Sequence, residues 1–288
     1  MTASEPRIAA VIPAYNAAGV LGDAIASLQR QTVPPDEILV VDDGSADDTA
    51  AVAEAAGARV IRQANGGPAA ARNAGIEATT AEWIALLDSD DLAYPTRLER
   101  EREHLSDPAT AVVFSGAIVP GRLRPPTDAV TFASLWQQNQ IITSTVLLRR
   151  AAWSALGGFD EARELIGVED YNLWLRLAHA GWQFSQVADQ LVEYRPGAAS
   201  LTAQTRRFAA AEMANIRRIA ERLQLDAGTV QAKEHAVYLN YAFDFFHARD
   251  LPAARDFFRE AARRGPLPLA ARIRLMATVL PLRRRNAR

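Results

Sequence analysis

The stretch Trp83-Ile-Ala-Leu-Leu-Asp-Ser-Asp-Asp91 decides the fold class of this chain. Its first five residues are apolar, as in a buried β-strand, and the run stops abruptly at acidic residues. Residues 8–16 and 37–45 repeat this pattern of an apolar run followed by polar residues, with helical spacing between them. Alternating strands and helices predict an α/β fold, Rossmann-like, with a mostly parallel central sheet flanked by helices.

Further apolar runs predict strands at residues 60–61, 111–114, 144–148, 184–187 and 191–194. Pro68 is well placed to open a helix, because proline is favoured at the first helical position. Near Ser200 the composition changes to a helical pattern rich in Ala and Arg. We therefore expect two domains, 1–200 and 201–288, with an antiparallel helix pair within residues 236–264 of the second.

The composition excludes several classes of protein. The chain has 288 residues, is 49% hydrophobic and carries a formal net charge of −2, so it has no overall basic field for nucleic acid. It contains no cysteine, which excludes disulfides and thiolate metal sites. No segment reaches the roughly 20 apolar residues of a membrane span, and residues 1–7 lack the features of a signal peptide. We expect a cytoplasmic location.

Three polar motifs follow predicted strands: Pro13-Ala-Tyr-Asn16, Asp42-Asp-Gly-Ser45 and Asp88-Ser-Asp-Asp91. Ligands of open α/β sheets bind beyond the carboxyl ends of the strands, so these motifs should converge on one edge. The acids of the third motif would repel one another unless a divalent cation neutralised them. The alternative is a polar turn in which Asp91 caps the next helix.

Asp43 has the chemistry to accept a hydrogen bond from a nucleobase, although an ordinary strand-to-helix turn explains the same residues. Gly66-Gly67-Pro68 followed by Arg72 could bring N–H groups and a guanidinium near phosphate. Here the alternative is a loop and a structural ion pair. The spacing is not that of a Walker loop, and no dinucleotide fingerprint follows the first strand.

Glu169 and Asp170 precede a predicted helix at residues 171–180. Acids in a first turn commonly complement the helix dipole, but beside a metal site one of them could act as a general base. The four histidines show no ligand spacing, and no nucleophilic serine elbow is present.

Taken in order, these motifs closely resemble the family 2 glycosyltransferases, which have the GT-A fold. The resemblance covers roughly residues 7–200. The matching segments are Val11-Ile-Pro-Ala-Tyr-Asn16, Val41-Asp-Asp-Gly-Ser-Ala-Asp-Asp-Thr49, Gly67-Pro-Ala-Ala-Ala-Arg-Asn-Ala-Gly-Ile76, Trp83-Ile-Ala-Leu-Leu-Asp-Ser-Asp-Asp91, Ser144-Thr-Val-Leu-Leu-Arg149, Gly157-Gly-Phe-Asp-Glu161 and Glu169-Asp-Tyr-Asn-Leu-Trp-Leu-Arg-Leu177.

The resemblance implies an inverting transfer of sugar from a nucleotide-sugar, usually a UDP-sugar, to an acceptor hydroxyl of a carbohydrate, lipid-linked or protein acceptor. It implies Mn²⁺ or Mg²⁺ on Asp90 and Asp88, and Asp170 as the base with Glu169 as its alternative. The processive members carry a Gln-x-x-Arg-Trp motif and membrane helices, both absent here, so a single transfer per encounter is expected. The donor would be bound by Pro13, Ala14, Tyr15, Asn16, Asp43, Gly67, Arg72, Asp88, Ser89 and Arg195, with Ser200 following in the segment that closes over the diphosphate.

Two other functions remain open at the level of sequence. A nucleotidyltransferase would also use acidic metal ligands, but its usual Gly-rich loop is missing after the first strand. A degenerate family member could bind the nucleotide-sugar without catalysis. The sugar, the acceptor and the linkage are not specified by any motif.

The C-terminal helices have no motif, and could contact the acceptor, a second copy in a homo-oligomer, or a membrane. Leu269, Ile273, Met276 and Leu280 share one helical stripe with arginines beside it. Such a stripe suits peripheral contact at the inner face of a membrane, and equally a terminal helix packed on its own domain.

Overall fold

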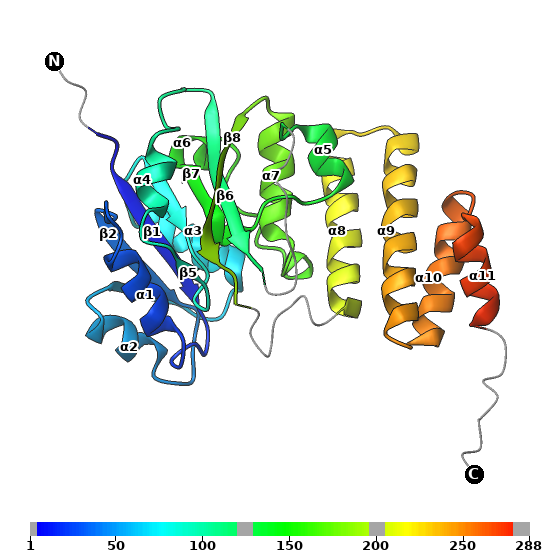
Figure 1. Ribbon diagram of the computed structural model, residues 1–288, viewed down its shortest axis with the longest axis horizontal. Helices are drawn as coiled ribbons and strands as arrows, with labels where there is room; N and C mark the ends of the chain where they lie inside the picture. Colours follow the sequence, from blue (N-terminus) through cyan, green and yellow to red (C-terminus); the bar gives the residue numbers. More distant parts are fainter. Residues whose placement is uncertain (1–4, 120–128, 196–204, 279–288) are drawn as a thin grey trace, which may run out of the picture. The chain divides into compact units, whose positions relative to one another are not determined.

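The structure is a computed structural model that describes residues 5–119, 129–195 and 205–278. The chain forms two compact units, Met1–Ser200 and Leu201–Arg288. The first is an eight-stranded sheet with helices on both faces, and the second is helical (Figure 1). The predicted α/β fold class is therefore confirmed.

The sheet has the strand order β3-β2-β1-β4-β7-β6-β8-β5. β1 to β4 pair in parallel, whereas β7 runs antiparallel to both of its neighbours, β4 and β6. The two short strands predicted at 184–187 and 191–194 are one strand, β8, whose pairing with β6 contains register shifts. The strands are β1 (Ile8–Ala14), β2 (Glu37–Asp42), β3 (Arg59–Arg62), β4 (Trp83–Leu86), β5 (Leu92–Ala93), β6 (Thr110–Ile118), β7 (Val146–Arg149) and β8 (Gln183–Glu193).

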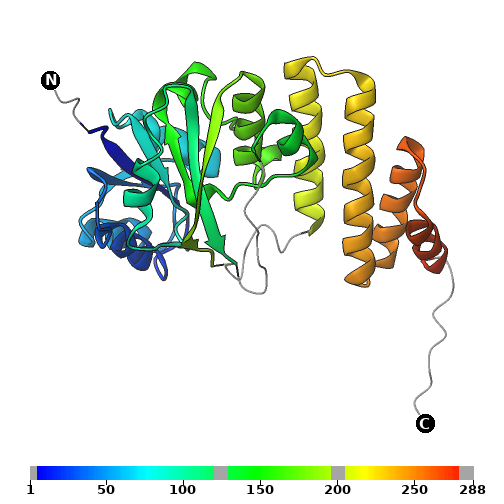
Figure 2. The same cartoon turned by 45° about the horizontal axis from the view of Figure 1, so that its top comes forward.

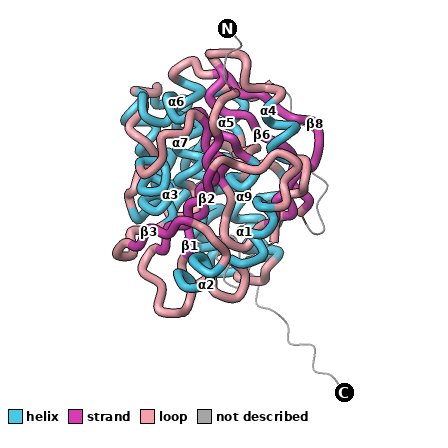
Figure 3. The backbone as a smooth tube through the Cα atoms, turned by 90° about the vertical axis from the view of Figure 1, so that its left-hand side faces the viewer, coloured by secondary structure: helices cyan, strands magenta, loops and turns pink. Residues whose placement is uncertain are grey.

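Helices cover both faces of this sheet, with α1 and α4 on one face and α3, α6 and α7 on the other (Figure 3). Alternate residues of β1 explain the two layers. Ile8, Ala10 and Ile12 belong to the core formed with α1, whereas Val11 points toward α3. The helical segments are α1 (Leu21–Gln29), α2 (Thr49–Ala55), α3 (Pro68–Glu77), α4 (Arg97–Arg102), α5 (Phe132–Gln137), α6 (Arg150–Ala155) and α7 (Glu169–His179), with short 3-10 turns η1 (Thr143–Thr145) and η2 (Arg163–Leu165).

Helix α3 lies unusually close to the sheet because residue 75 is a glycine. A Cβ atom at Gly75 would lie 2.5 Å from Val11 Cγ1 and 3.1 Å from Val41 Cγ2. Only hydrogen fits between the helix and strands β1 and β2, and this contact fixes the position of α3. The side chain of Arg72, one turn earlier on α3, is held in place with it.

The second unit contains α8 (Thr205–Leu223), α9 (Ala227–His247), α10 (Leu251–Arg264) and α11 (Leu269–Ala277). Figures 1 and 2 both show α8, α9 and α10 side by side. The predicted antiparallel pair is α9 and α10, joined by a short turn in which Arg249 has a φ of 64°. The ring of Phe257 packs against Tyr238, Tyr241 and Phe245 across this pair.

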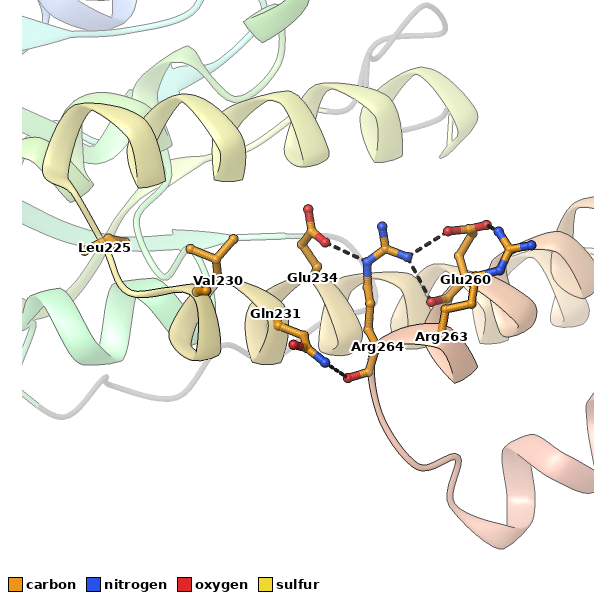
Figure 4. Close-up of a pocket in the computed structure, with 8 residues that line it drawn as sticks. Leu225, Val230, Gln231, Glu234, Glu260, Arg263 and Arg264 are labelled. Carbon is orange, nitrogen blue, oxygen red and sulfur yellow. Dashed lines mark hydrogen bonds and ion pairs between the residues drawn. The ribbon is translucent and has the colours of Figure 1, made fainter.

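A pocket of about 610 Å³ opens at the surface of α9 and α10 (Figure 4). Its polar side is organised by Arg264, whose Nε lies 2.6 Å from Glu234 and whose Nη1 lies 2.7 Å from Glu260. Leu225 and Val230 supply apolar lining. Within the described ranges, no helix is long and apolar enough to cross a bilayer.

Candidate active site

The sequence motifs meet at one edge of the sheet. β1, β2 and β4 are parallel, so Tyr15, Asp43 and Asp88 all follow carboxyl ends at the same edge. β7 runs the other way, which brings its preceding turn, η1, to that edge as well. The first turns of α3 and α7 complete the arrangement. Hydrogen bonds from Arg72 to Glu169 and from Thr143 to Asp170 join these elements.

Arg72 is the centre of the cluster. Its side chain is 4% exposed, and its two terminal nitrogens reach different acids: Nη1 lies 2.6 Å from Glu169 and Nη2 lies 2.7 Å from Asp88. Burial alone would lower the pKa of Arg72, but the charges of Asp88 and Glu169 outweigh burial and raise it. Arg72 thus makes the ion pairs expected of a structural arginine, and through them holds two predicted site acids in fixed positions.

The acids after β4 have different surroundings. Asp88 is paired with Arg72, and its backbone N–H donates to Ser144 Oγ at 3.0 Å. Asp90 and Ser89 are half-buried in the turn, and Asp90 accepts a hydrogen bond from no other residue in the described ranges. Burial and the nearby charge of Asp88 raise the pKa of Asp90. The same two causes raise the pKa of Asp91, which is fully buried, to about 7.

Asp170 and Glu169 start α7 but are held differently. Glu169 has both oxygens engaged, one by Arg72 and the other by the N–H of Gly167 at 2.7 Å. Asp170 accepts a hydrogen bond from Thr143 Oγ1 at 2.5 Å and from the N–H of Tyr171 at 2.6 Å. Burial and the charge of Glu169 raise the pKa of Asp170 to about 6, although Thr143 and Arg72 oppose the shift.

Asp43 is 3% exposed and organises the turn before α3. Its Oδ1 accepts from Gln63 Nε2 at 2.7 Å and from the N–H of Gly66 at 2.8 Å, and its Oδ2 accepts from the N–H of Gly67 at 2.8 Å. The N–H groups of Gly66 and Gly67, which were expected near phosphate, thus donate to Asp43 in this structure. Gly67 has a φ of +91°, a conformation that favours glycine.

The segment after β1 presents one large exposed ring. Tyr15 is 55% exposed, whereas Ala14 before it is buried and Pro13 is half-buried. Asn16, with a φ of 50°, accepts from the N–H of Ala46 and donates its own N–H to Ser45 Oγ. These bonds fix the turn after β1 against the turn after β2, so Tyr15 stands beside Asp43's loop.

Arg195 lies just after β8, and its N–H donates to Asp91 at 2.8 Å. The guanidinium is paired with Glu193 at 2.8 Å and with Asp23 at 3.5 Å. Its contact with a diphosphate stays a prediction. Ser200, which was expected to follow in the same segment, lies outside the described residues.

Two acids, Asp88 and Asp90, are available for a divalent ion. In residues 5–119, 129–195 and 205–278 no group of three or more His, Asp or Glu side chains is arranged to hold a metal. Two carboxylates nevertheless fit Mg²⁺ or Mn²⁺, since such ions commonly take one or two protein carboxylates and complete their shell with substrate phosphates. The carboxylate of Asp90, which accepts from no described residue other than its own N–H, suits this role.

Three polar residues of the site were not assigned a role by the sequence. Thr143 and Ser144 contact Asp170 and the N–H of Asp88, and Gln63 contacts Asp43. Ser144 stood at the start of a family-like segment, which was the available signal for η1. Nothing in the sequence distinguished Gln63 from a loop residue.

Comparison with known proteins shows which family this unit is similar to. Residues 9–150 match the model of glycosyl transferase family 2. The N-terminal unit belongs to this family. An uncharacterized glycosyltransferase of Rickettsia prowazekii is 29% identical over 189 residues, which are 59% of this chain and 58% of the relative's own length. TuaG of Bacillus subtilis, a putative teichuronic acid biosynthesis glycosyltransferase, is 27% identical over 68% of this chain and 81% of its own length.

Solved structures of other proteins share the fold. S. aureus TarS 1-349 in complex with UDP-GlcNAc has a TM-score of 0.65 at 19% identity, covering 94% of this chain and 89% of TarS 1-349. The mannosyltransferase PcManGT of Pyrobaculum calidifontis, in complex with GDP-Man and Mn²⁺, has a TM-score of 0.65 at 21% identity, covering 95% of this chain and 80% of its own. At these identities the likeness establishes the GT-A fold of the family 2 unit.

Proposed function

We propose that this protein is an inverting glycosyltransferase that moves a sugar from a nucleotide-sugar, most simply a UDP-sugar, to an acceptor hydroxyl. It would make one transfer per encounter, in polysaccharide, glycolipid or glycoprotein synthesis. The observation that carries the proposal is the buried bridge from Asp88 through Arg72 to Glu169, with Asp170 beside it. This bridge joins residues far apart in sequence at one edge of the sheet, which supports a donor side around Asp88 and an acceptor side around Asp170.

Asp170 is better suited than Glu169 to be the base. Both acids accept a hydrogen bond on each oxygen, but one oxygen of Glu169 is held by the buried guanidinium of Arg72, whereas Asp170 accepts only from a hydroxyl and a backbone N–H. With a pKa of about 6, Asp170 is ionised at pH 7 yet more basic than an ordinary carboxylate, as efficient proton transfer requires. Asp170 takes the proton of the acceptor hydroxyl while that oxygen bonds to the anomeric carbon and the nucleoside diphosphate leaves. A single in-line displacement inverts the anomeric centre.

On the donor side, the exposed ring of Tyr15 offers a stacking surface for a nucleobase. Asp43 Oδ2 accepts one N–H, from Gly67, and a carboxylate oxygen has a second lone pair for an imide N–H of the base. Asp88 and Asp90 would hold the metal ion, which supplies neutralising charge to the leaving diphosphate. The loops around the donor would be formed by Pro13, Ala14, Asn16, Gly67 and Ser89. Arg195 would supply a positive charge to the diphosphate.

The complexes of related folds support the substrate class, since TarS binds UDP-GlcNAc and PcManGT binds GDP-Man with Mn²⁺. A thermal-shift screen of UDP-GlcNAc, UDP-glucose and GDP-mannose, each with and without Mn²⁺, tests it. A true donor raises the melting temperature by mass action, and does so more strongly with the metal. Slow metal-dependent hydrolysis of that donor would separate an enzyme from a binding protein. Release of pyrophosphate from a nucleoside triphosphate would instead indicate a nucleotidyltransferase.

A further inference from the structure

Helix α11 presents its apolar residues to solvent. Leu269 is 72% exposed, Ile273 is 58% exposed and Met276 is 70% exposed. The spacing i, i+4, i+7 places all three on one side of the helix. Ala271, the buried residue of α11, lies on the opposite side. Helix α11 thus packs on its own unit through the side of Ala271 and leaves these three apolar side chains exposed. Leu280, the fourth residue of the predicted stripe, lies outside the described residues.

The charge of this region is one-sided. Residues 263–288 contain eight arginines and no acidic residue, and of these Arg263 and Arg264 are paired with Glu260 and Glu234. Arg272 flanks the apolar stripe, is exposed, and makes no ion pair with another described residue. Arg274 packs its guanidinium over the rings of Phe243 and Phe246, at 5.1 and 5.8 Å. The arginines are Arg263, Arg264, Arg272, Arg274, Arg283, Arg284, Arg285 and Arg288.

We propose that the exposed face of α11, formed by Leu269, Arg272, Ile273 and Met276, binds the surface of an anionic lipid bilayer. Nine helical residues extend about 14 Å, less than half of the hydrocarbon thickness, so α11 lies along the interface. The three apolar side chains enter the headgroup boundary while Arg272 beside them meets lipid phosphates.

A second copy of the chain fits this face poorly. Two identical α11 faces would bring the two copies of Arg272 close to each other, and α11 carries no acidic residue to compensate them. Three apolar side chains also bury far less than the roughly 800 Å² per partner of a stable interface. An anionic bilayer provides the opposite charge and accepts isolated apolar side chains.

Vesicle co-sedimentation of the full chain tests this proposal, independently of any transfer activity. The probes are phosphatidylcholine vesicles and phosphatidylcholine vesicles with one quarter phosphatidylglycerol, at 0.1 M and 0.5 M NaCl. Binding to the anionic vesicles at low salt, with much weaker binding to neutral vesicles or at high salt, is expected because screening removes the charge attraction. Equal binding to both vesicles, or none to either, overturns the proposal.

Matched variants locate the contact. Ile273→Glu should lower vesicle partition by about tenfold or more, whereas Val20→Glu, which changes an exposed apolar residue of the other unit, should not. Arg272→Glu should lower it by roughly 30-fold, and Arg207→Glu on α8 should have a much smaller effect. Equal partition of Ile273→Glu and Val20→Glu overturns the assignment. So does a wild-type dimer, detected by light scattering, that Ile273→Glu dissociates and that does not bind anionic vesicles.

Discussion

Arg72 in the N-terminal unit and Arg264 in the C-terminal unit each bridge two carboxylates, but in different surroundings. Arg72 is 4% exposed and connects Asp88 with Glu169. Glu169 lies 97 residues after Arg72 in the chain. The side chain of Arg264 is 19% exposed and connects Glu260, in its own helix, with Glu234 in the neighbouring helix. One arginine joins distant segments inside the protein, and the other links two adjacent helices at the surface.

The pKa values of acids near these two arginines are shifted in opposite directions. The hydrogen bond from Arg264 lowers the pKa of Glu260, as solvated ion pairs do. Near Arg72, burial raises the pKa of Asp170 despite the positive charge. A buried cluster can thus keep a carboxyl group basic near neutral pH, whereas a surface pair only stabilises the charged form. This difference separates a candidate catalytic cluster from a structural one.

The substitution Asp170→Asn tests whether the buried cluster contains the general base, and it should have the largest effect. Removal of a general base costs on the order of 10²–10⁴-fold in rate, so transfer should almost disappear. Donor binding in the thermal-shift assay should persist, because Asp170 is proposed to act on the acceptor and not to hold the donor. Asp189→Asn, at an exposed surface pair, serves as the control and should retain activity. Normal turnover of Asp170→Asn would remove Asp170 from the mechanism.

Arg72→Met tests the buried bridge itself. It keeps an unbranched apolar stem but leaves Asp88 and Glu169 without their cation, which should reduce the free energy of unfolding by about 3–5 kcal/mol. Chemical denaturation measures the loss. A variant as stable as the wild type would show that the acids reach solvent when the guanidinium is absent, and that the cluster is not truly buried.

The pH dependence of transfer tests whether buried Asp170 has the raised pKa that distinguishes it from the surface acid Glu260. A base works only when deprotonated, so kcat/KM should fall as the pH drops below the pKa of Asp170, about 6. The fall should approach tenfold per pH unit below that value, with a plateau above it. Rates measured from pH 4.5 to 8 at a fixed metal concentration provide the profile. Constant activity down to pH 4.5 would contradict the raised pKa.

The smallest effect is expected for Arg264→Met, the matched change at the surface. Partly exposed ion pairs contribute little, so we expect a loss of about 1 kcal/mol in unfolding free energy, including the contact of Arg264 with the Tyr238 ring. Part of this loss should vanish in 0.5 M NaCl through screening. A destabilisation equal to that of Arg72→Met would erase the distinction between the two regions.

The sequence predicted the strands and the acids that follow them because both depend on local patterns. Apolar runs ending at Asp42 and Asp88 are visible without a structure. The partner of Arg72 was not predictable, since nothing local links it to Glu169. The contact of Thr143 with Asp170 depends on β7 running antiparallel, which an apolar run does not reveal. In the C-terminal unit the helix pair was predictable from spacing, but the exposure of Ile273 required the three-dimensional packing.

The antiparallel direction of β7 has a consequence for how the recognition surface at this edge of the sheet can change. The pairing of β4 with β7 brings the turn after β4 next to the turn before β7, where the N–H of Asp88 donates to Ser144. The chain between them supports both strands, since β6 pairs with β7 and buried Arg97 donates to the carbonyl oxygens of Leu86 and Val146. Substitutions in the two turns can therefore alter what this edge recognises while the strands that carry them stay paired.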